Sequence, residues 1–183
     1  MWLPKVLDGG LATTIERNGH RLHKELWSAH LIRAHPTAIA QAHAQFARAG
    51  ARVATTATYQ ACTQNLVEHL GVDVREAERF IASSVPLARM AARANAQAVD
   101  EVCVAGSIGC FGACLADGSE YTGAYGATAS EDELMRWHED RLRILLDAGA
   151  DVIALETIPC RVEVRALCRL LRSYPNARAW LSM

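Results

Sequence analysis

The chain repeats one short phrase at two places, and this phrase limits the possible folds more than any other feature. Residues 49–53 read Ala-Gly-Ala-Arg-Val and residues 148–152 read Ala-Gly-Ala-Asp-Val. In both, a glycine ends a helical pattern and an apolar run follows directly. Glycine is common just past a helix C-terminus, and a short apolar run is typical of a buried strand. The phrase therefore predicts short helix-to-strand connections, as in α/β proteins.

Strand and helix patterns alternate along the whole chain. Strand patterns cover 6–7, 52–58, 102–108, 151–156 and 179–182, and helical patterns cover 36–49, 74–97, 130–148 and 161–173. Ser130 and Glu133 match a capping box, and Pro86 is expected to kink or divide the second helix. Strands separated by helices indicate a parallel sheet, either doubly wound or a (β/α)8 barrel. The repeated phrase and the polar residues at the strand ends favour the TIM-type barrel.

Length and charge narrow the possible functions. A barrel of this type needs about 250 residues, whereas this chain has 183. We therefore expect 1–183 to be the N-terminal part of a single, incomplete barrel domain, with four βα units and a fifth strand. The formal net charge of −1 argues against nucleic acid as a partner. With no apolar run long enough to span a membrane and no signal-peptide core, we predict no membrane association and a cytoplasmic location.

The cysteines and histidines give weak signals. No pair of the six cysteines has CxxC spacing, and most are expected to be small buried residues. Cys110 and Cys114 could hold a metal, but a single CxxxC is weak support. His138 falls in a predicted helix, where a surface or packing role is expected, and no histidine is assigned to chemistry.

Two acidic residues follow predicted strands directly. Asp8 is followed by Gly9 and Gly10, so its carboxylate could hold an ammonium group while the glycine N–H groups approach a ligand carboxylate. A simple turn is the alternative. Glu156 ends the fourth strand, where a carboxylate is costly unless it is paired or solvated in a cleft. A carboxylate at the start of the next helix is the alternative there.

Two loop patterns are also notable. Residues 106–112 are predicted to be a glycine-rich loop after a strand, but they lack the Lys-Ser/Thr of a P-loop, which argues against phosphate binding. Residues 115–121 are rich in polar side chains within a long loop, and such loops are often functional in α/β proteins. A solvated turn is the alternative.

Taken together, these phrases resemble the homocysteine S-methyltransferase family. The matching segments are 7–13 (Leu-Asp-Gly-Gly-Leu-Ala-Thr), 26–29, 49–51, 55–61 (Thr-Thr-Ala-Thr-Tyr-Gln-Ala), 106–109, 115–123, 148–151 and 156–159. They span nearly the whole chain in the family's order. The phrase at 116–121 (Ala-Asp-Gly-Ser-Glu-Tyr) resembles the branch that uses S-methylmethionine or S-adenosylmethionine.

The resemblance implies a (β/α)8 barrel that transfers a methyl group from a sulfonium donor to the thiol of homocysteine, giving methionine. In the family, zinc binds the substrate thiol and lowers its pKa, which produces a thiolate nucleophile. The amino-acid end of homocysteine is then expected at Asp8, Gly9, Gly10 and Glu156. Thr58, Gln60 and Ser107 are expected to line the same site.

This sequence departs from the family pattern in two ways. The three zinc-binding cysteines of the family, which include an adjacent pair, have no counterpart here, so no metal site is assigned and no residue is assigned a catalytic role. Cys110 also stands where the family usually has proline. Because the zinc-binding cysteines are missing, we expect the chain to be inactive alone. Self-association or a separate C-terminal half is expected, because half a barrel leaves two strand edges unpaired. The alternative is a non-catalytic half-barrel that binds an amino acid or pairs with another chain.

Overall fold

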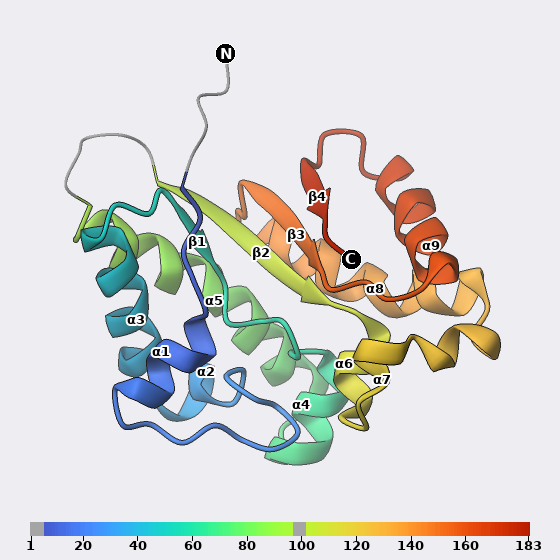
Figure 1. Ribbon diagram of the computed structural model, residues 1–183, viewed down its shortest axis with the longest axis horizontal. Coiled ribbons are helices and arrows are strands. Elements are labelled where there is room, and N and C mark those ends of the chain that lie inside the picture. The colour runs from blue at the N-terminus through green and yellow to red at the C-terminus, as the bar shows by residue number, and fades with distance from the viewer. Residues whose placement is uncertain (1–5, 97–101) are drawn as a thin grey trace.

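The computed structural model describes residues 6–96 and 102–183, and its centre is a parallel four-stranded sheet (Figure 1). The strands are β1 (Val53–Thr55), β2 (Cys103–Gly109), β3 (Val152–Glu156) and β4 (Ala179–Leu181), and they neighbour one another in chain order. Leu7 continues the sheet beyond β1 through a parallel bridge to Val53. A strand order without a reversal lacks the switch point of a doubly wound sheet and matches part of a β/α barrel.

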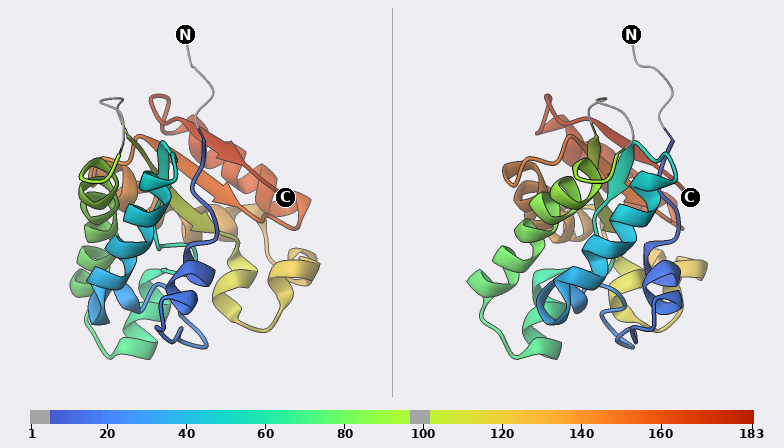
Figure 2. Two further views of the ribbon diagram at one scale, coloured as in Figure 1. Left: turned by 60° about the vertical axis from the view of Figure 1, so that its left-hand side comes forward. Right: turned by 90° about the vertical axis from the view of Figure 1, so that its left-hand side faces the viewer.

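Four long helices form one layer against the sheet. They are α3 (Pro36–Arg48), α5 (Val74–Arg93), α8 (Glu131–Asp147) and α9 (Arg161–Arg172), and each packs on the next. Figure 2 shows this layer on one side of the strands. Strand residues such as Val104 and Ile153 join the main core with the helices, whereas Val53, Ala105 and Val152 belong to a separate small cluster that packs against Trp180. This alternation along the strands follows from the twofold repeat of a β-strand.

Three of the long helices confirm the sequence predictions to within about one turn, a normal uncertainty for helix ends. The capping box also forms, because the Ser130 hydroxyl accepts from the N–H of Glu133 and the Glu133 side chain accepts from the N–H of Ser130. The prediction that Pro86 could divide its helix is wrong, since α5 runs through it. Pro86 lies on the exposed side of α5, and the helix tolerates both its missing N–H and the crowding of its ring against the preceding turn. The predicted end of this helix, at residue 97, lies outside the described residues.

The strands and short helices show the larger differences. Residues 106–109 form the second half of β2, so the predicted glycine-rich loop is in fact strand up to Gly109. Gly106 packs closely on α8, because a Cβ atom there would lie 3.1 Å from the Cβ of Leu145 and one of the two would have to shift. The structure adds short helices that were not predicted: α1 (Leu11–Arg17), α2 (Leu31–Ala34), α4 (Thr63–Leu70), α6 (Phe111–Leu115), α7 (Ser119–Thr122) and η1 (Ala124–Ala127).

The cysteines are all free, and only Cys62, Cys103 and Cys110 are fully buried. Cys114 and Cys160 are half-buried and Cys168 is exposed, so burial of most cysteines was an overestimate. Within residues 6–96 and 102–183, no helix is both long enough and apolar enough to cross a bilayer.

Candidate functional site

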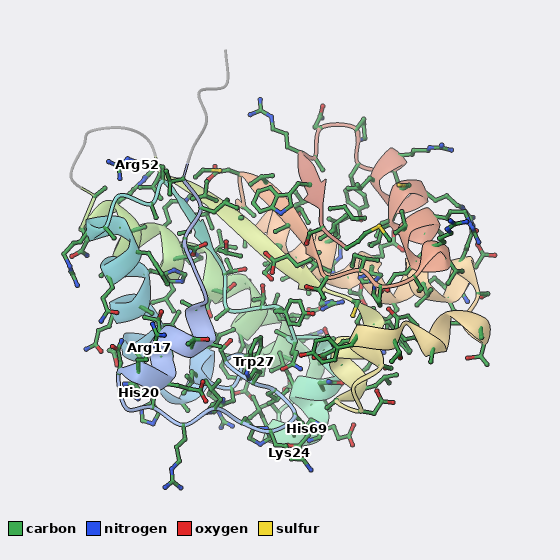
Figure 3. The ribbon with its side chains drawn as sticks, in the orientation of Figure 1. Arg17, His20, Lys24, Trp27, Arg52 and His69 are labelled. Atoms are coloured by element: carbon green, nitrogen blue, oxygen red, sulfur yellow. The ribbon has the colours of Figure 1, made fainter. Side chains whose placement is uncertain are left out.

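A cavity of ≈ 520 Å³ opens at the carboxyl ends of the strands. Asp8 reaches it from the segment beside β1, Ser107 from β2 and Glu156 from the end of β3. Trp27 comes from the loop after α1, and in Figure 3 it lies toward the far end of β1 from Arg52, which immediately precedes that strand. This is the edge of a parallel sheet at which α/β proteins place their ligands.

The Asp8 carboxylate is fixed by Thr55 at the end of β1. Its Oδ2 accepts from the Thr55 N–H at 2.7 Å and its Oδ1 accepts from the Thr55 hydroxyl at 2.7 Å. The Asp8 side chain is only 4% exposed. Burial raises the pKa of Asp8 to about 6, although the two hydrogen bonds from Thr55 act to lower it. The carboxylate is therefore held in position but is poorly solvated as an anion.

Glu156 occupies the same cavity. The Ser107 hydroxyl donates to Glu156 Oε2 at 3.2 Å. Burial raises the pKa of Glu156, the hydrogen bond from Ser107 lowers it, and the negative charge of Asp8 raises it again. The two carboxylates thus lie close enough to repel each other electrostatically. A cation between them would remove this repulsion.

The glycine pair lies beside Asp8 on the cavity wall. Gly10 is the N-cap of α1, and no side chain caps this helix. A Cβ atom on Gly9 would lie 2.9 Å from Cε1 of Phe46, so a larger residue there would require the Phe46 ring to move. Because both residues are glycines, only main-chain atoms of this pair face the cavity.

Thr58 and Gln60 lie near the cavity but are not among the described residues that line it. Thr58 is fully buried, and its hydroxyl donates to the Ser107 carbonyl at 2.7 Å. The Gln60 side chain donates to the Ala113 carbonyl at 2.9 Å. The structure thus brings Asp8, Gly9, Gly10, Ser107 and Glu156 together at one surface and places Thr58 and Gln60 in contacts that support the neighbouring loops.

Aromatic side chains and a strained backbone complete the cavity. Trp27 and Tyr59 meet edge-to-face with ring centroids 6.0 Å apart, and Tyr121 and Trp180 also line the wall. Thr157 directly follows Glu156 and has a φ of 54°, which is costly for a β-branched residue. Sequence reasoning missed Trp27, Tyr59 and Thr157 as lining residues. The available signal was that Tyr59 and Thr157, like Asp8 and Glu156, follow strand patterns directly.

The charge of the lining is one-sided. Asp8, Glu120 and Glu156 supply three carboxylates, and no Lys, Arg or His is found among the described lining residues. Across the part of the chain that the structure describes, no group of three or more His, Cys, Asp or Glu side chains is arranged to hold a metal ion. Cys110 and Cys114 therefore do not form such a site with a third ligand there.

Comparison with known proteins places this cavity in context. The family model described as homocysteine S-methyltransferase matches residues 5–183. The chain belongs to the homocysteine S-methyltransferase family. It is 44% identical over 184 residues to homocysteine S-methyltransferase YbgG of Bacillus subtilis, which covers 97% of this chain and 57% of that protein. It is also 44% identical over 181 residues to homocysteine S-methyltransferase of Escherichia coli, with the same coverage.

The fold agrees with a solved member of the family. The metallated form of the homocysteine methyltransferase MmuM from Escherichia coli superposes with a TM-score of 0.90 at 42% sequence identity, covering 98% of this chain and 62% of that one. The chain thus spans somewhat more than half the length of its curated relatives. In the described part of the present chain, no group of three or more His, Cys, Asp or Glu side chains is placed to hold a metal ion.

Proposed function

We propose that the cavity binds homocysteine, as part of a (β/α)8 barrel enzyme that transfers a methyl group to the homocysteine thiol and forms methionine. The observation that carries this proposal is the pairing of Asp8 with Glu156 in one cavity whose described lining residues include no basic side chain. An α-ammonium group carries the charge that such a cavity requires. Family membership supports the choice of homocysteine over other amino acids.

The proposal gives a role to each residue that the sequence assigns to the site, and to Thr55. Asp8 and Glu156 accept hydrogen bonds from the ammonium group, and Thr55 and Ser107 hold the two carboxylates in place. The main chain at Gly9 and Gly10 receives the substrate carboxylate, because backbone N–H groups there can approach it closely. Thr58 and Gln60 position the loops around the site rather than contacting the ligand.

The methyl donor that we propose is a sulfonium compound, S-methylmethionine or S-adenosylmethionine. A sulfonium carries a positive charge, so an acidic cavity attracts it, and its leaving group departs neutral without a general acid. The phrase at 116–121, which resembles the branch using these donors, includes the cavity residue Glu120. Tyr121 lies beside it on the same wall.

The zinc ion implied by the family resemblance does not fit the residues described here, because they offer no group of three ligands. We therefore assign this chain substrate binding and orientation only, and expect no methyl transfer from the chain alone. A non-catalytic half-barrel that binds an amino acid is the second candidate, and the same absence of a metal cluster favours it.

Calorimetric titration with L-homocysteine tests the binding proposal. Glu156→Gln and Asp8→Asn should each weaken binding by about 1.5–3 kcal/mol, the range for a hydrogen bond to a charged group. Glu139→Gln, at an exposed position on α8, is the matched control and should bind like the unchanged chain. The analogue 4-mercaptobutanoate, which lacks the ammonium group, should bind weakly and be insensitive to all three substitutions. Equal binding of homocysteine by every variant would contradict the assignment.

An assay for methionine formation separates the two candidate functions. It would contain the chain, homocysteine and S-methylmethionine, with and without added zinc. Methionine formation by the chain alone would overturn the expectation of inactivity. If no methionine forms, comparing homocysteine with methionine and cysteine in the calorimeter shows whether the site prefers the methyl acceptor or takes amino acids in general.

A further inference from the structure

Two cysteines outside the cavity come from segments that lie beside each other, the start of α4 and the end of α6. Cys62 is the N-cap of α4 and is 2% exposed, and Cys114 lies in the last turn of α6 and is half-buried. The Gln60 carbonyl accepts from both the Cys62 N–H at 3.1 Å and the Cys114 thiol at 3.7 Å, which places the Cys114 sulfur beside the main chain of Cys62. The two cysteines come from segments more than fifty residues apart, yet they form one dithiol.

Three hydrogen bonds hold these segments together. The Gln60 amide donates to the Ala113 carbonyl at 2.9 Å, the Asn65 amide donates to the Cys114 carbonyl at 2.7 Å, and the Cys114 thiol donates to the Gln60 carbonyl at 3.7 Å. Bonds on both sides of Cys62 therefore fix the main chain around Cys114. These bonds place the end of α6 beside the start of α4.

The surroundings of Cys62 favour a thiolate. Its Sγ accepts from the Asn65 N–H at 3.4 Å, in the orientation that a helix N-terminus offers to an anion. The neighbouring Cys114 thiol lowers the pKa of the Cys62 thiol, burial raises it, and the Arg141 guanidinium lowers it again. The neighbouring Cys62 sulfur and burial raise the pKa of Cys114, which therefore keeps its proton. Cys62 is therefore the nucleophilic thiolate of the pair. Cys114 is the resolving thiol, which can attack an oxidised Cys62.

We propose that Cys62 and Cys114 form a redox-active pair that a hydroperoxide converts into an intramolecular disulfide. The Cys62 thiolate attacks a peroxide oxygen, the O–O bond breaks, and the departing hydroxide or alkoxide takes up a proton. The resulting sulfenic acid on Cys62 is attacked by the Cys114 sulfur, which loses its proton as the S–S bond forms and water leaves. The two thiols lose two electrons in total, and the peroxide gains them.

The disulfide would join two walls of the cavity. Tyr59 lies three residues before Cys62, and Glu120 follows Cys114 in α7, and both line the cavity. A bond between the two loops would fix their separation. Formation of the disulfide does not depend on which ligand the cavity binds.

Peptide mapping after treatment with hydrogen peroxide tests the proposal. Trypsin releases Cys62 on residues 53–75, while Cys103, Cys110 and Cys114 share residues 94–136. We expect these two peptides to become cross-linked in the intact chain and to separate again after reduction. The cross-link should persist in Cys110→Ser and disappear in Cys114→Ser, in which a sulfenic acid on Cys62 should be trapped by dimedone.

Cys168 provides the internal comparison, because it is an exposed single thiol on α9. At neutral pH we expect peroxide to consume Cys62 about tenfold faster than Cys168, because the Asn65 N–H at the start of α4 stabilises the Cys62 thiolate. Cys62→Ala, checked for folding by circular dichroism, should lose the fast phase. A cross-link that survives Cys114→Ser, or oxidation confined to Cys168, would overturn the proposal.

Discussion

The buried imidazole of His43 lies behind the carboxylate of Asp8, with Nδ1 3.9 Å from Oδ2. This separation is too long for a hydrogen bond, and neither ring nitrogen has a hydrogen-bond partner in the part of the chain that the structure describes. Burial lowers the pKa of His43 to about 4, so the ring is neutral at physiological pH. His43 therefore does not neutralise Asp8, and the carboxylate needs a cation from the cavity side.

Homocysteine binding should strengthen as pH rises through about 6. Burial raises the pKa of Asp8 to about 6, so the carboxylate that faces the ammonium group is protonated below this pH. Titrations from pH 5 to 8 should show the rise in affinity in the unchanged chain and a flatter profile in Asp8→Asn. An affinity that is constant over this range would show that Asp8 does not hold the ammonium group.

The same ionisation should destabilise the unliganded fold. Because the folded-state pKa of Asp8 is raised from 3.8 to about 6, the folded chain binds the proton more tightly than the unfolded chain. The contribution of Asp8 to stability is therefore full at acid pH and is lost as pH rises from about 4 to 6. The difference in unfolding free energy between the unchanged chain and Asp8→Asn should fall by at most about 3 kcal/mol over this range.

Urea unfolding at several pH values measures this difference. His43 and His138 have lowered pKa values, mainly through burial, and so contribute the opposite dependence, with stability lost as pH falls from about 6.5 to 4. Both histidines are present in both proteins, so their effect cancels in the comparison. A difference that increases with pH would contradict the raised pKa of Asp8.

Glu163 is fully buried and joins α9 to α8, α6 and η1. Its carboxylate accepts from the Phe111 N–H at 2.7 Å and from the Tyr125 hydroxyl, and it contacts Nε2 of His138 at 2.7 Å. Arg141, which has no acceptor, lies 3.2 Å from Nδ1 of His138. His138 Nδ1 must therefore accept, and the neutral ring donates to Glu163 through Nε2. The sequence predicts either a surface role or a packing role for His138. Because its side chain is fully buried, the packing role is confirmed.

Glu163→Ala should lower the free energy of unfolding by about 3–5 kcal/mol, because it leaves several buried donors without an acceptor. Glu163→Gln keeps the side-chain volume and one acceptor oxygen, so it should lower the free energy of unfolding by less than Glu163→Ala does. Denaturant unfolding measures both, with exposed Glu139→Gln as the control. A loss in Glu163→Ala no larger than that of the control would show that the network contributes little stability.

Thr157 should be a site of stored strain, because its φ of 54° is unfavourable for a β-branched residue. Asparagine tolerates this conformation, so Thr157→Asn should raise the unfolding free energy by about 1 kcal/mol. Thr157→Val keeps both the strain and the β-branched shape, so it should not gain this stability. A destabilised Thr157→Asn, by thermal unfolding, would show that the contacts of threonine outweigh the strain.

The sequence predicted the structure best at positions where the residue type has one characteristic structural role. Gly50 and Gly149 end helices with φ values of 108° and 87°, and Ser130 caps α8 as its pattern predicts. Asp8 and Glu156 share a cavity because the carboxyl ends of parallel strands meet at one edge. Helices as short as α2 and α7 contain about one turn, so they carry no periodicity to detect. The Glu163 network joins residues far apart in sequence, and no local pattern indicates it.

The outer edge of β4 should promote self-association of the 183-residue chain. In the described sheet β4 pairs only with β3, so one row of its backbone groups has no strand partner there. Trp180 and Leu181 on this strand are only half-buried. Ala179→Lys places a charge on the edge at an exposed position, and it should shift the chain toward monomer in light scattering at micromolar concentration. Ala124→Lys, at an exposed position in η1, adds the same charge away from the edge and should leave the association unchanged. Monodisperse monomer in the unchanged chain, unfolding in one cooperative transition, would show that this edge needs no partner.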